Sequence, residues 1–248
     1  MLPDVNFVAG KSLEQQQLQS VLRMRELAVK QKTAINNQLS ALLLEFNIKV
    51  SSRNGGLKGA IALALEDAEN GFSMIFRQAI EQMWHQFIHC IELINKFDDC
   101  LKELLEATPQ CKKLMKLEGV GIINAINLYI TFSTSEIGVF KDGKAAAACI
   151  GLTPLQHSSG GKTKLGSIGK QVKNSMLRSQ LVTGAFTYVN QVTRRDARSQ
   201  KDKWLQSLIE RRGKKCASVA LANKTVRTAF AMLTNNTEYK TTKLMLEA

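Results

Sequence analysis

The sequence predicts a mainly α-helical protein, with a long antiparallel, coiled-coil-like helical arm followed by a compact basic helical domain that contains a helix-hairpin-helix. Three observations support this fold class. Apolar residues recur at helical spacing over two long stretches, about 12–47 and about 73–108. Only three prolines occur in 248 residues, so long helices can run without interruption. Positive charge gathers in the second half of the chain.

The first long helix begins at a capping box, in which Ser12 is the N-cap and Gln15 follows three residues later. Apolar side chains then recur every three or four residues as far as Phe46. The run Ser51–Gly56 breaks this pattern, and a short helix is expected over about 57–69.

The second long helix carries an apolar seam in steps of four and three, held for about three and a half heptads. The seam consists of Ile80, Trp84, Phe87, Ile91, Ile94, Phe97, Leu101 and Leu104. Two such helices make an antiparallel pair, and we expect the pair to form a homo-oligomer, a dimer or a tetramer. An intramolecular bundle is the alternative.

His85 and His89 lie one turn apart on the second long helix, with Glu81 one turn earlier. This spacing suits zinc, but both histidines fall off the apolar seam and no third strong ligand is evident. We therefore expect solvated histidines and no metal site.

Residues 114–125 have the apolar–Gly–apolar–Gly form of a helix-hairpin-helix, with Gly119 and Gly121 at the turn. The free N–H groups that open the second helix of such a motif can hold a phosphate. A purely structural turn explains the glycines equally well, and Glu118 places a negative charge where a phosphate would approach.

The basic half of the chain points to a polyanion. Between Gly143 and Leu233 there are 17 Lys and Arg against three acidic residues, while the whole chain has a net charge of +13. A nucleic acid is the expected partner. Helices are expected over about 173–189, 201–210 and 217–233, with a break at Arg211–Lys215. The predicted domains are an arm over 1–112, the basic domain over 113–233 and a polar tail over 234–248.

Residues 148–165 are the most informative stretch. An apolar run ends at Pro154 and opens into an expected loop, where Gly160 and Gly161 allow a tight turn. Serine hydroxyls next to lysines could attack or hold a phosphodiester, although the same residues suit an ordinary polar loop. We expect little or no sheet, at most a short hairpin near Lys162–Ile168.

Composition excludes several classes of protein. Hydrophobic residues make up 44% of the chain and charged residues 22%, so it can fold around a core. Five cysteines without a Cys-x-x-Cys pair predict free thiols in a reducing compartment. No signal core or membrane-length apolar run occurs, so the expected location is the cytoplasm.

Taken in order, several segments resemble the C-terminal transposase domain of the insertion-sequence "one-ten" family, the DEDD-type, RNA-guided bacterial transposases. The matching segments are Leu117–Ala125, Phe140, Ala148–Pro154, His157–Lys162 and Leu177–Arg178. Flanking matches are Leu22–Leu27, Gln38–Leu39 and Leu44–Phe46 in the arm, and Ala220–Lys224, Arg227 and Tyr239 near the end of the chain.

The resemblance implies a DNA transposase or recombinase that joins strands through a serine nucleophile. That serine maps onto Ser159, with Ser158 as the fallback. It also implies DNA and a guide RNA as partners, and Mg²⁺ bound by an acidic RNase-H-like domain, with no cofactor held by this chain. The implied nucleic-acid contacts are Gly119, Gly121, Lys162, Lys164, Lys170, Lys173, Arg178, Lys224 and Arg227, of which Lys162, Lys164 and Arg178 would face the transition state.

The sequence departs from the family pattern in three places. It begins where the acidic domain of the family would have ended, Glu118 replaces the usual Pro, and residues 168–174 lose an Arg and a Gly. We therefore expect the chain alone to be catalytically incomplete. The alternative function is a non-catalytic nucleic-acid-binding scaffold that dimerises through its long helices.

Overall fold

The computed structural model describes residues 10–133, 140–159, 161–169 and 175–240. These residues fall into two compact units. The two-helix unit is Ser20–Lys102, and the basic unit comprises the described residues up to Gln19 and from Glu103 onward. Within the described ranges, no helix is long and apolar enough to cross a membrane.

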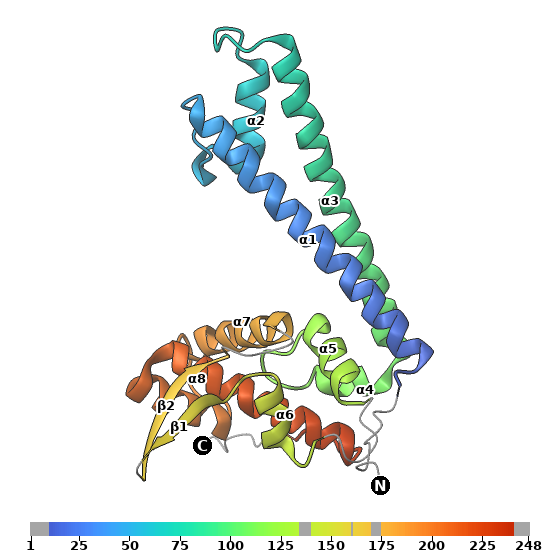
Figure 1. Cartoon of the computed structure of the whole chain (residues 1–248), viewed down its shortest axis with the longest axis vertical. Coiled ribbons are helices and arrows are strands. Elements are labelled where there is room, and N and C mark those ends of the chain that lie inside the picture. Colours follow the sequence, from blue (N-terminus) through green and yellow to red (C-terminus); the bar gives the residue numbers. More distant parts are fainter. Residues whose placement is uncertain (1–9, 134–139, 160, 170–174, 241–248) are drawn as a thin grey trace. The chain divides into compact units, whose positions relative to one another are not determined.

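Two long helices, α1 (Leu13–Glu45) and α3 (Met74–Ala107), dominate the N-terminal half (Figure 1). Between them lie a single 3₁₀ turn, η1 (Ser52–Asn54), and the short helix α2 (Gly56–Glu66). The predicted capping box is confirmed. The Gln15 amide donates to Ser12 Oγ at 3.2 Å, and the Ser12 amide donates to Gln15 Oε1 at 3.0 Å.

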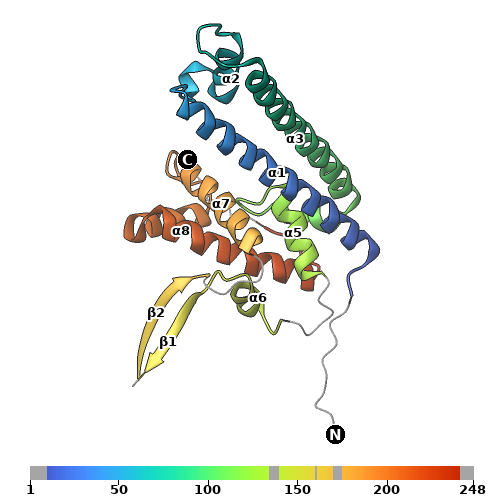
Figure 2. The same ribbon diagram turned by 45° about the horizontal axis from the view of Figure 1, so that its top comes forward.

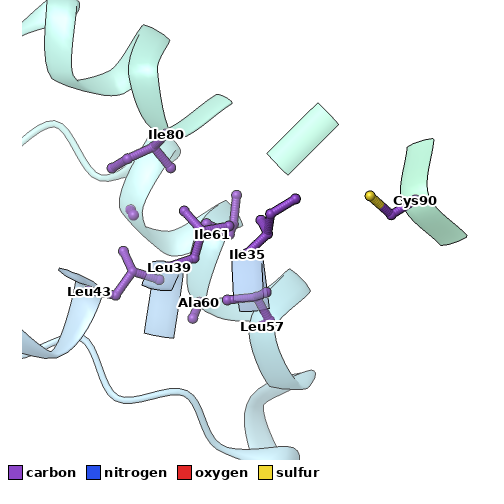
Figure 3. Close-up of a cluster of buried hydrophobic side chains, with 9 residues drawn as sticks. Ile35, Leu39, Leu43, Leu57, Ala60, Ile61, Ile80 and Cys90 are labelled. Atoms are coloured by element: carbon purple, nitrogen blue, oxygen red, sulfur yellow. The ribbon is translucent and has the colours of Figure 1, made fainter. Parts of the chain in front are cut away.

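The core of the two-helix unit lies where α2 meets the two long helices (Figure 3). Helix α2 buries four apolar side chains, Leu57, Ala60, Ile61 and Ala64. They pack with Ile35, Leu39 and Leu43 of α1 and with Ile80 and Cys90 of α3. This short helix therefore supplies an apolar partner for the long pair within the same chain.

The predicted seam of α3 is largely covered within the chain. Ile80, Ile94 and Leu101 are buried, while Trp84, Phe87 and Ile91 are half-buried. Trp84 and Phe87 stack on each other with ring centres 5.3 Å apart and pack against the core of the two-helix unit. The intramolecular packing that was the alternative to self-association therefore accounts for most of the seam.

Helices also dominate the basic unit, and the prediction of a mainly α fold is confirmed. Its elements are α4 (Pro109–Leu114), α5 (Ile122–Phe132), α6 (Gly143–Cys149), β1 (Pro154–Ser159), β2 (Lys162–Ile168), α7 (Ser175–Val192) and α8 (Gln200–Thr234). Helices α6 and α7 both pack against α8 (Figures 1 and 2). The one sheet in the described residues is the antiparallel pair β1–β2.

Helix α8 is broken at Gly213, inside the predicted break at Arg211–Lys215. Gly213 has φ 79° and ψ 167°, outside the helical region and in a part of conformational space that favours glycine. The chain folds back there, because Lys224 Nζ lies 4.6 Å from the ring centre of Trp204. The two halves of α8 therefore lie side by side.

The cysteines have free thiols, as predicted. Cys90 and Cys111 are buried and the other three are exposed. Burial raises the pKa of the Cys111 thiol to about 12, with a smaller contribution from the charge of Glu14. Cys111 is therefore an inert core residue.

A buried carboxylate holds the turn between α7 and α8. Asp202, fully buried, accepts hydrogen bonds from the Tyr188 hydroxyl (2.8 Å), the Arg195 guanidinium (2.9 Å) and the Arg198 amide (2.9 Å). Burial acts to raise the pKa of Asp202, but these three donors outweigh it and hold the pKa below its ordinary value. Both carboxylate oxygens thus accept hydrogen bonds, and these bonds fix the start of α8.

Replacing Asp202 by Asn is expected to lower the free energy of unfolding by about 3 kcal/mol, because it leaves the half-buried Arg195 guanidinium without its counter-charge. The folded pKa is depressed, so the carboxylate stabilises the protein above the unfolded pKa of about 3.9, and this contribution is lost as pH falls through the folded pKa. Urea unfolding of both proteins should show a gap in the free energy of unfolding at pH 7 that narrows as the pH falls below about 3.9. Asp99→Asn, at an exposed pair with Lys102, is the control and should change nothing. An Asp202→Asn protein as stable as the parent at pH 7 would contradict the assignment.

Candidate functional site

The serine stretch forms a β-hairpin rather than the predicted loop. Ser158 and Ser159 end strand β1, where Ser159 pairs with Lys162 and Ser158 with Thr163. Gly161, directly before strand β2, has φ +76°, while Gly160 lies outside the described residues. Glycines are favoured between paired strands because the tight hairpin turns need positive φ. The expected tight turn and the expected short hairpin are present, and the strands take up residues assigned to a loop.

Ser159 is exposed at the end of the hairpin, directly beside the turn. Lys162, which is exposed, is paired with Ser159 across the two strands and lies directly opposite it. His157 lies two residues away and therefore on the same face of the strand as Ser159. Its ring, however, lies over Gly166, where Cδ2 is 3.7 Å from the position that a Cβ would occupy. His157 thus packs toward the base of the hairpin and away from Ser159.

The base of the hairpin is remote from Ser159. Five residue steps at about 3.3 Å separate Pro154 from Ser159, or about 17 Å. In both ribbon views the hairpin projects from the helices of the basic unit (Figures 1 and 2). Arg178 lies beyond the base, because its guanidinium covers Gly169 and its Nη1 donates to the Ile168 carbonyl at 3.5 Å. The fold therefore places Lys162 next to Ser159 and holds Arg178 at the opposite end.

A basic groove runs along the C-terminal half of α8, at the base of the hairpin. It has a volume of about 960 Å³ and is lined by Lys224 and Arg227, two of the predicted nucleic-acid contacts. Lys144 adds a third cation from α6. All three side chains are exposed. The other lining residues are Asp142, Gly143, Leu152, Pro154, Ile168, Trp204, Cys216, Val219, Ala220, Asn223, Thr228 and Ala231.

The two glycines of the predicted helix-hairpin-helix have different roles. Gly119 has φ +75°, and a Cβ there would lie 2.8 Å from the Gly184 carbonyl oxygen of α7. Gly119 is therefore required for packing. Gly121 is the N-cap of α5, with φ −96°, and a Cβ on it would meet nothing within 4 Å. The fold does not require glycine at 121, so a DNA contact remains a prediction for that position.

Glu118 is neutralised by its neighbours. Lys201 Nζ donates to Glu118 Oε2 at 2.6 Å, and the Tyr239 hydroxyl donates to Glu118 Oε1 at 2.8 Å. The Lys201 and Glu118 side chains are only 11% and 9% exposed, so this pair is part of the interior. The negative charge that would repel a phosphate at the hairpin is thus buried and paired.

Some predicted residues cannot be placed. Lys170 and Lys173 lie outside the described residues, and for Ser158 and Lys164 the structure describes only the backbone. In the ladder, Lys164 pairs with His157.

The residues present do not fit a magnesium site. In the part of the chain that the structure describes, no group of three or more His, Cys, Asp or Glu side chains could hold a metal ion. Asp98 and Asp99 of α3 are engaged in ion pairs with Arg25 and Lys102. His85 and His89 are exposed on the same helix.

Sequence reasoning missed Lys144 and Trp204 as groove residues, and Lys201 as the partner of Glu118. Lys144 lies in an alanine-rich stretch with no pattern that marks it. Trp204 could have been found, since it is one of only two tryptophans and lies in the basic half. Lys201 carries no local signal, because its partner is 83 residues away.

The chain is similar to several insertion-sequence transposases. The profile described as "Transposase IS116/IS110/IS902 family" matches residues 111–201, which include both hairpins and α7. The transposase for insertion sequence element IS1111A of Coxiella burnetii is 33% identical over 236 residues, which cover 95% of this chain and 64% of that protein. A "Probable family 20 transposase" of Pseudomonas aeruginosa is 31% identical over 96% of this chain and 69% of its own length. The transposase for element IS1328 of Yersinia enterocolitica is 26% identical, with the same coverage. The chain thus spans about two thirds of the length of these relatives.

Proposed function

Because the chain belongs to the IS116/IS110/IS902 family of transposases, we propose that it is the DNA-binding and strand-joining part of an insertion-sequence transposase, with Ser159 as the nucleophile. The observation that carries this proposal is the position of Ser159. It is exposed at the turn of a projecting hairpin, beside Lys162, where DNA and a second catalytic domain can both reach it.

In the proposed step, Ser159 Oγ attacks a DNA phosphorus and forms an Oγ–P bond. The bond from phosphorus to one deoxyribose oxygen breaks, and that oxygen takes a proton and leaves as a sugar hydroxyl. The serine proton passes to a base. The free energy of the broken phosphodiester bond is retained in the serine–phosphate bond, so rejoining the strand needs no nucleoside triphosphate. Lys162 offsets the negative charge that grows on the phosphoryl oxygens.

We propose that this chain needs the acidic, Mg²⁺-binding domain of the family for cleavage. When bound, Mg²⁺ would polarise the phosphate and activate the attacking hydroxyl. The described residues offer no such site, and His157, the basic side chain nearest in sequence, leans away from Ser159. The isolated 248 residues should therefore bind DNA and leave it uncut.

The test is to mix the chain with the acidic domain of a relative, Mg²⁺ and labelled DNA that carries insertion-sequence ends. A covalent protein–DNA adduct that resists denaturing electrophoresis is expected only when all components are present. An adduct formed by the 248 residues alone would overturn the proposed incompleteness, and no adduct with any relative's domain would overturn the catalytic role.

DNA binding by the basic unit should depend steeply on salt. Phosphate contacts by Lys144, Lys162, Lys224 and Arg227 would release about 0.9 counterion each, so the slope of log K against log salt should be about −3.6. Fluorescence anisotropy of a labelled duplex measures this slope. The useful range is about 50 to 200 mM salt, where the affinity of proteins with several phosphate contacts falls steeply. An affinity that does not change with salt would contradict binding through phosphates.

We also propose a guide RNA as partner, which rests on the resemblance alone, and self-association through the two-helix unit. Self-association has a structural basis in large apolar side chains that the chain leaves uncovered. In the two-helix unit these are Met24, Leu27, Leu44, Phe46, Val50, Leu63, Met74 and Ile75, of which Ile75 is 80% exposed.

Replacing Ile75 by Glu is expected to shift an oligomer to monomer without unfolding it, because the side chain makes little contact within the chain. Light scattering during size exclusion measures the change. Gln78→Glu, exposed one turn away on α3, adds the same charge but removes no apolar surface, and should have no effect. A parent protein that is already monomeric at high concentration would rule out self-association.

A non-catalytic scaffold is the second candidate. The observation that favours it is the distance of Ser159 from Lys224, Arg227 and Arg178, which all lie at or beyond the base of the hairpin. Among the predicted transition-state cations whose side chains the structure describes, Lys162 is the one beside the serine. The adduct experiment decides between the two candidates, since a scaffold would bind DNA and never attach to it.

A further inference from the structure

We propose that the groove along α8 binds an unpaired DNA strand. This inference rests on the proposed DNA-binding function and adds to it the form of the DNA and the surface that holds it. The floor of the groove is one face of α8, from Cys216 to Ala231, at helical spacing. Fifteen residue steps at 1.5 Å give a floor about 22 Å long. At about 3.4 Å per stacked nucleotide, this length accommodates several nucleotides.

The charges of the groove favour a polyanion. Lys144, Lys224 and Arg227 reach it from two elements, and Asp142 is the one acid among the lining residues. Asp142 serves its own helix, because it is the N-cap of α6 and accepts a hydrogen bond from the Ala145 amide at 2.8 Å. The groove thus offers three cations against one carboxylate that is already engaged.

The lining between these cations is apolar. Leu152, Pro154 and Ile168 come from the region of the hairpin base, and Val219 and Ala220 from α8. A duplex presents its charged phosphates and would leave such a surface without a partner. An unpaired strand presents the flat faces of its bases, which bind apolar and aromatic side chains while the phosphates follow the cations.

Trp204 provides a stacking surface at the wall of the groove. It is half-buried, and Lys224 Nζ lies 4.6 Å from its ring centre. This contact places the ammonium group over one face of the ring. A phosphate that draws Lys224 off the ring would leave this face to the base of the same nucleotide, so that base and phosphate are bound together.

Two uncharged polar side chains of the groove are held in place by hydrogen bonds to the backbone. Asn223 Nδ2 donates to the Leu152 carbonyl at 3.1 Å, and Thr228 Oγ1 donates to the Lys224 carbonyl at 2.9 Å. These bonds use the Thr228 hydroxyl proton and one of the two Asn223 N–H groups. The strand is therefore assigned to DNA on the proposed function, and the affinity for an RNA strand tests that assignment.

The two tryptophans of the chain make the test direct. In a Trp84→Phe background, Trp204 is the one remaining tryptophan, and its fluorescence should be quenched by a short oligothymidine. Affinities for this strand and for a duplex of equal length are measured in parallel by anisotropy. The measured quantity is the ratio of single-strand to duplex affinity.

Trp204→Leu is expected to lower this ratio about tenfold, the loss of one stacked base. Arg227→Gln, at an exposed position, should lower the affinity for the single strand as well and guards against misfolding of the Trp204 variant. Lys203→Gln removes an exposed charge of α8 that does not line the groove, and should leave the ratio unchanged.

Absence of quenching, or a single-strand affinity that neither groove variant lowers, would overturn the proposal and leave the groove to a protein segment. In that case the duplex affinity and the adduct experiment would still stand for the proposed function. Tighter binding of an RNA strand of matched sequence would overturn the assignment to DNA.

Discussion

Replacing Ser159 by Ala is expected to abolish the covalent adduct in the protein supplied with an acidic domain, with a loss of at least about a thousandfold in rate. The substitution removes the atom that forms the bond to phosphorus. It should not disturb the fold, because Ser159 is exposed at a strand end where alanine is sterically accepted. DNA affinity should stay within about twofold, since one neutral hydroxyl contributes little beside several phosphate contacts.

Ser158→Ala is the matched control, one residue earlier in the same strand. Successive strand residues face opposite sides, so only one of the two serines can share a face with Lys162. That serine is Ser159, its register partner. An adduct that survives Ser159→Ala and disappears with Ser158→Ala would move the nucleophile by one position. An adduct in the double variant would end the serine mechanism.

Replacing Gly184 by Ala should destabilise the basic unit by about 3 kcal/mol. Its new Cβ would lie 2.2 Å from the Gly119 carbonyl oxygen, and the atom in the way is backbone, which cannot rotate aside. For a domain of about this size, such a loss lowers the melting temperature by about 6–12 °C. Thermal melting followed by Trp204 fluorescence in the Trp84→Phe background reports on this unit.

Gly121→Ala is the control in the same hairpin, because its Cβ would enter open space at an ordinary φ. We expect its melting temperature to match that of the parent. If Gly121→Ala nevertheless weakens duplex binding, the close approach of a phosphate explains the glycine there. Equal melting temperatures for Gly184→Ala and the parent would show that α7 does not pack on the hairpin turn as described.

The helices were predictable because their signals are local. The seam and the capping box placed the long helices at about 12–47 and 73–108, and the structure has them at Leu13–Glu45 and Met74–Ala107. Gly213 was placed in a break because charged residues surround it without an apolar repeat. These features depend on neighbours within a few turns, which a sequence shows directly.

The strands of the serine hairpin could not be predicted in the same way. Polar residues and glycines dominate positions 154–168, so no sustained apolar alternation marks a strand in the sequence. The contact of Gly119 with Gly184 joins positions 65 apart, and Lys144 and Trp204 meet at the groove through packing on α8. The family motifs identified the serine and several lysines, but only the fold separates Ser159 from the cations at the base of the hairpin.

Residues near both ends of the described chain make hydrogen bonds within the basic unit. The basic unit therefore reaches its final structure only after both segments have been synthesised. Glu14 and Gln15 bond to Thr108 and Ser133, and Tyr239 bonds to Glu118. Since a ribosome releases the chain from its N-terminus, the two-helix unit has all its own residues once Lys102 has emerged. The early residues of the basic unit wait for Tyr239 before Glu118 has all its partners. The two-helix unit can therefore fold on the ribosome before the basic unit is complete.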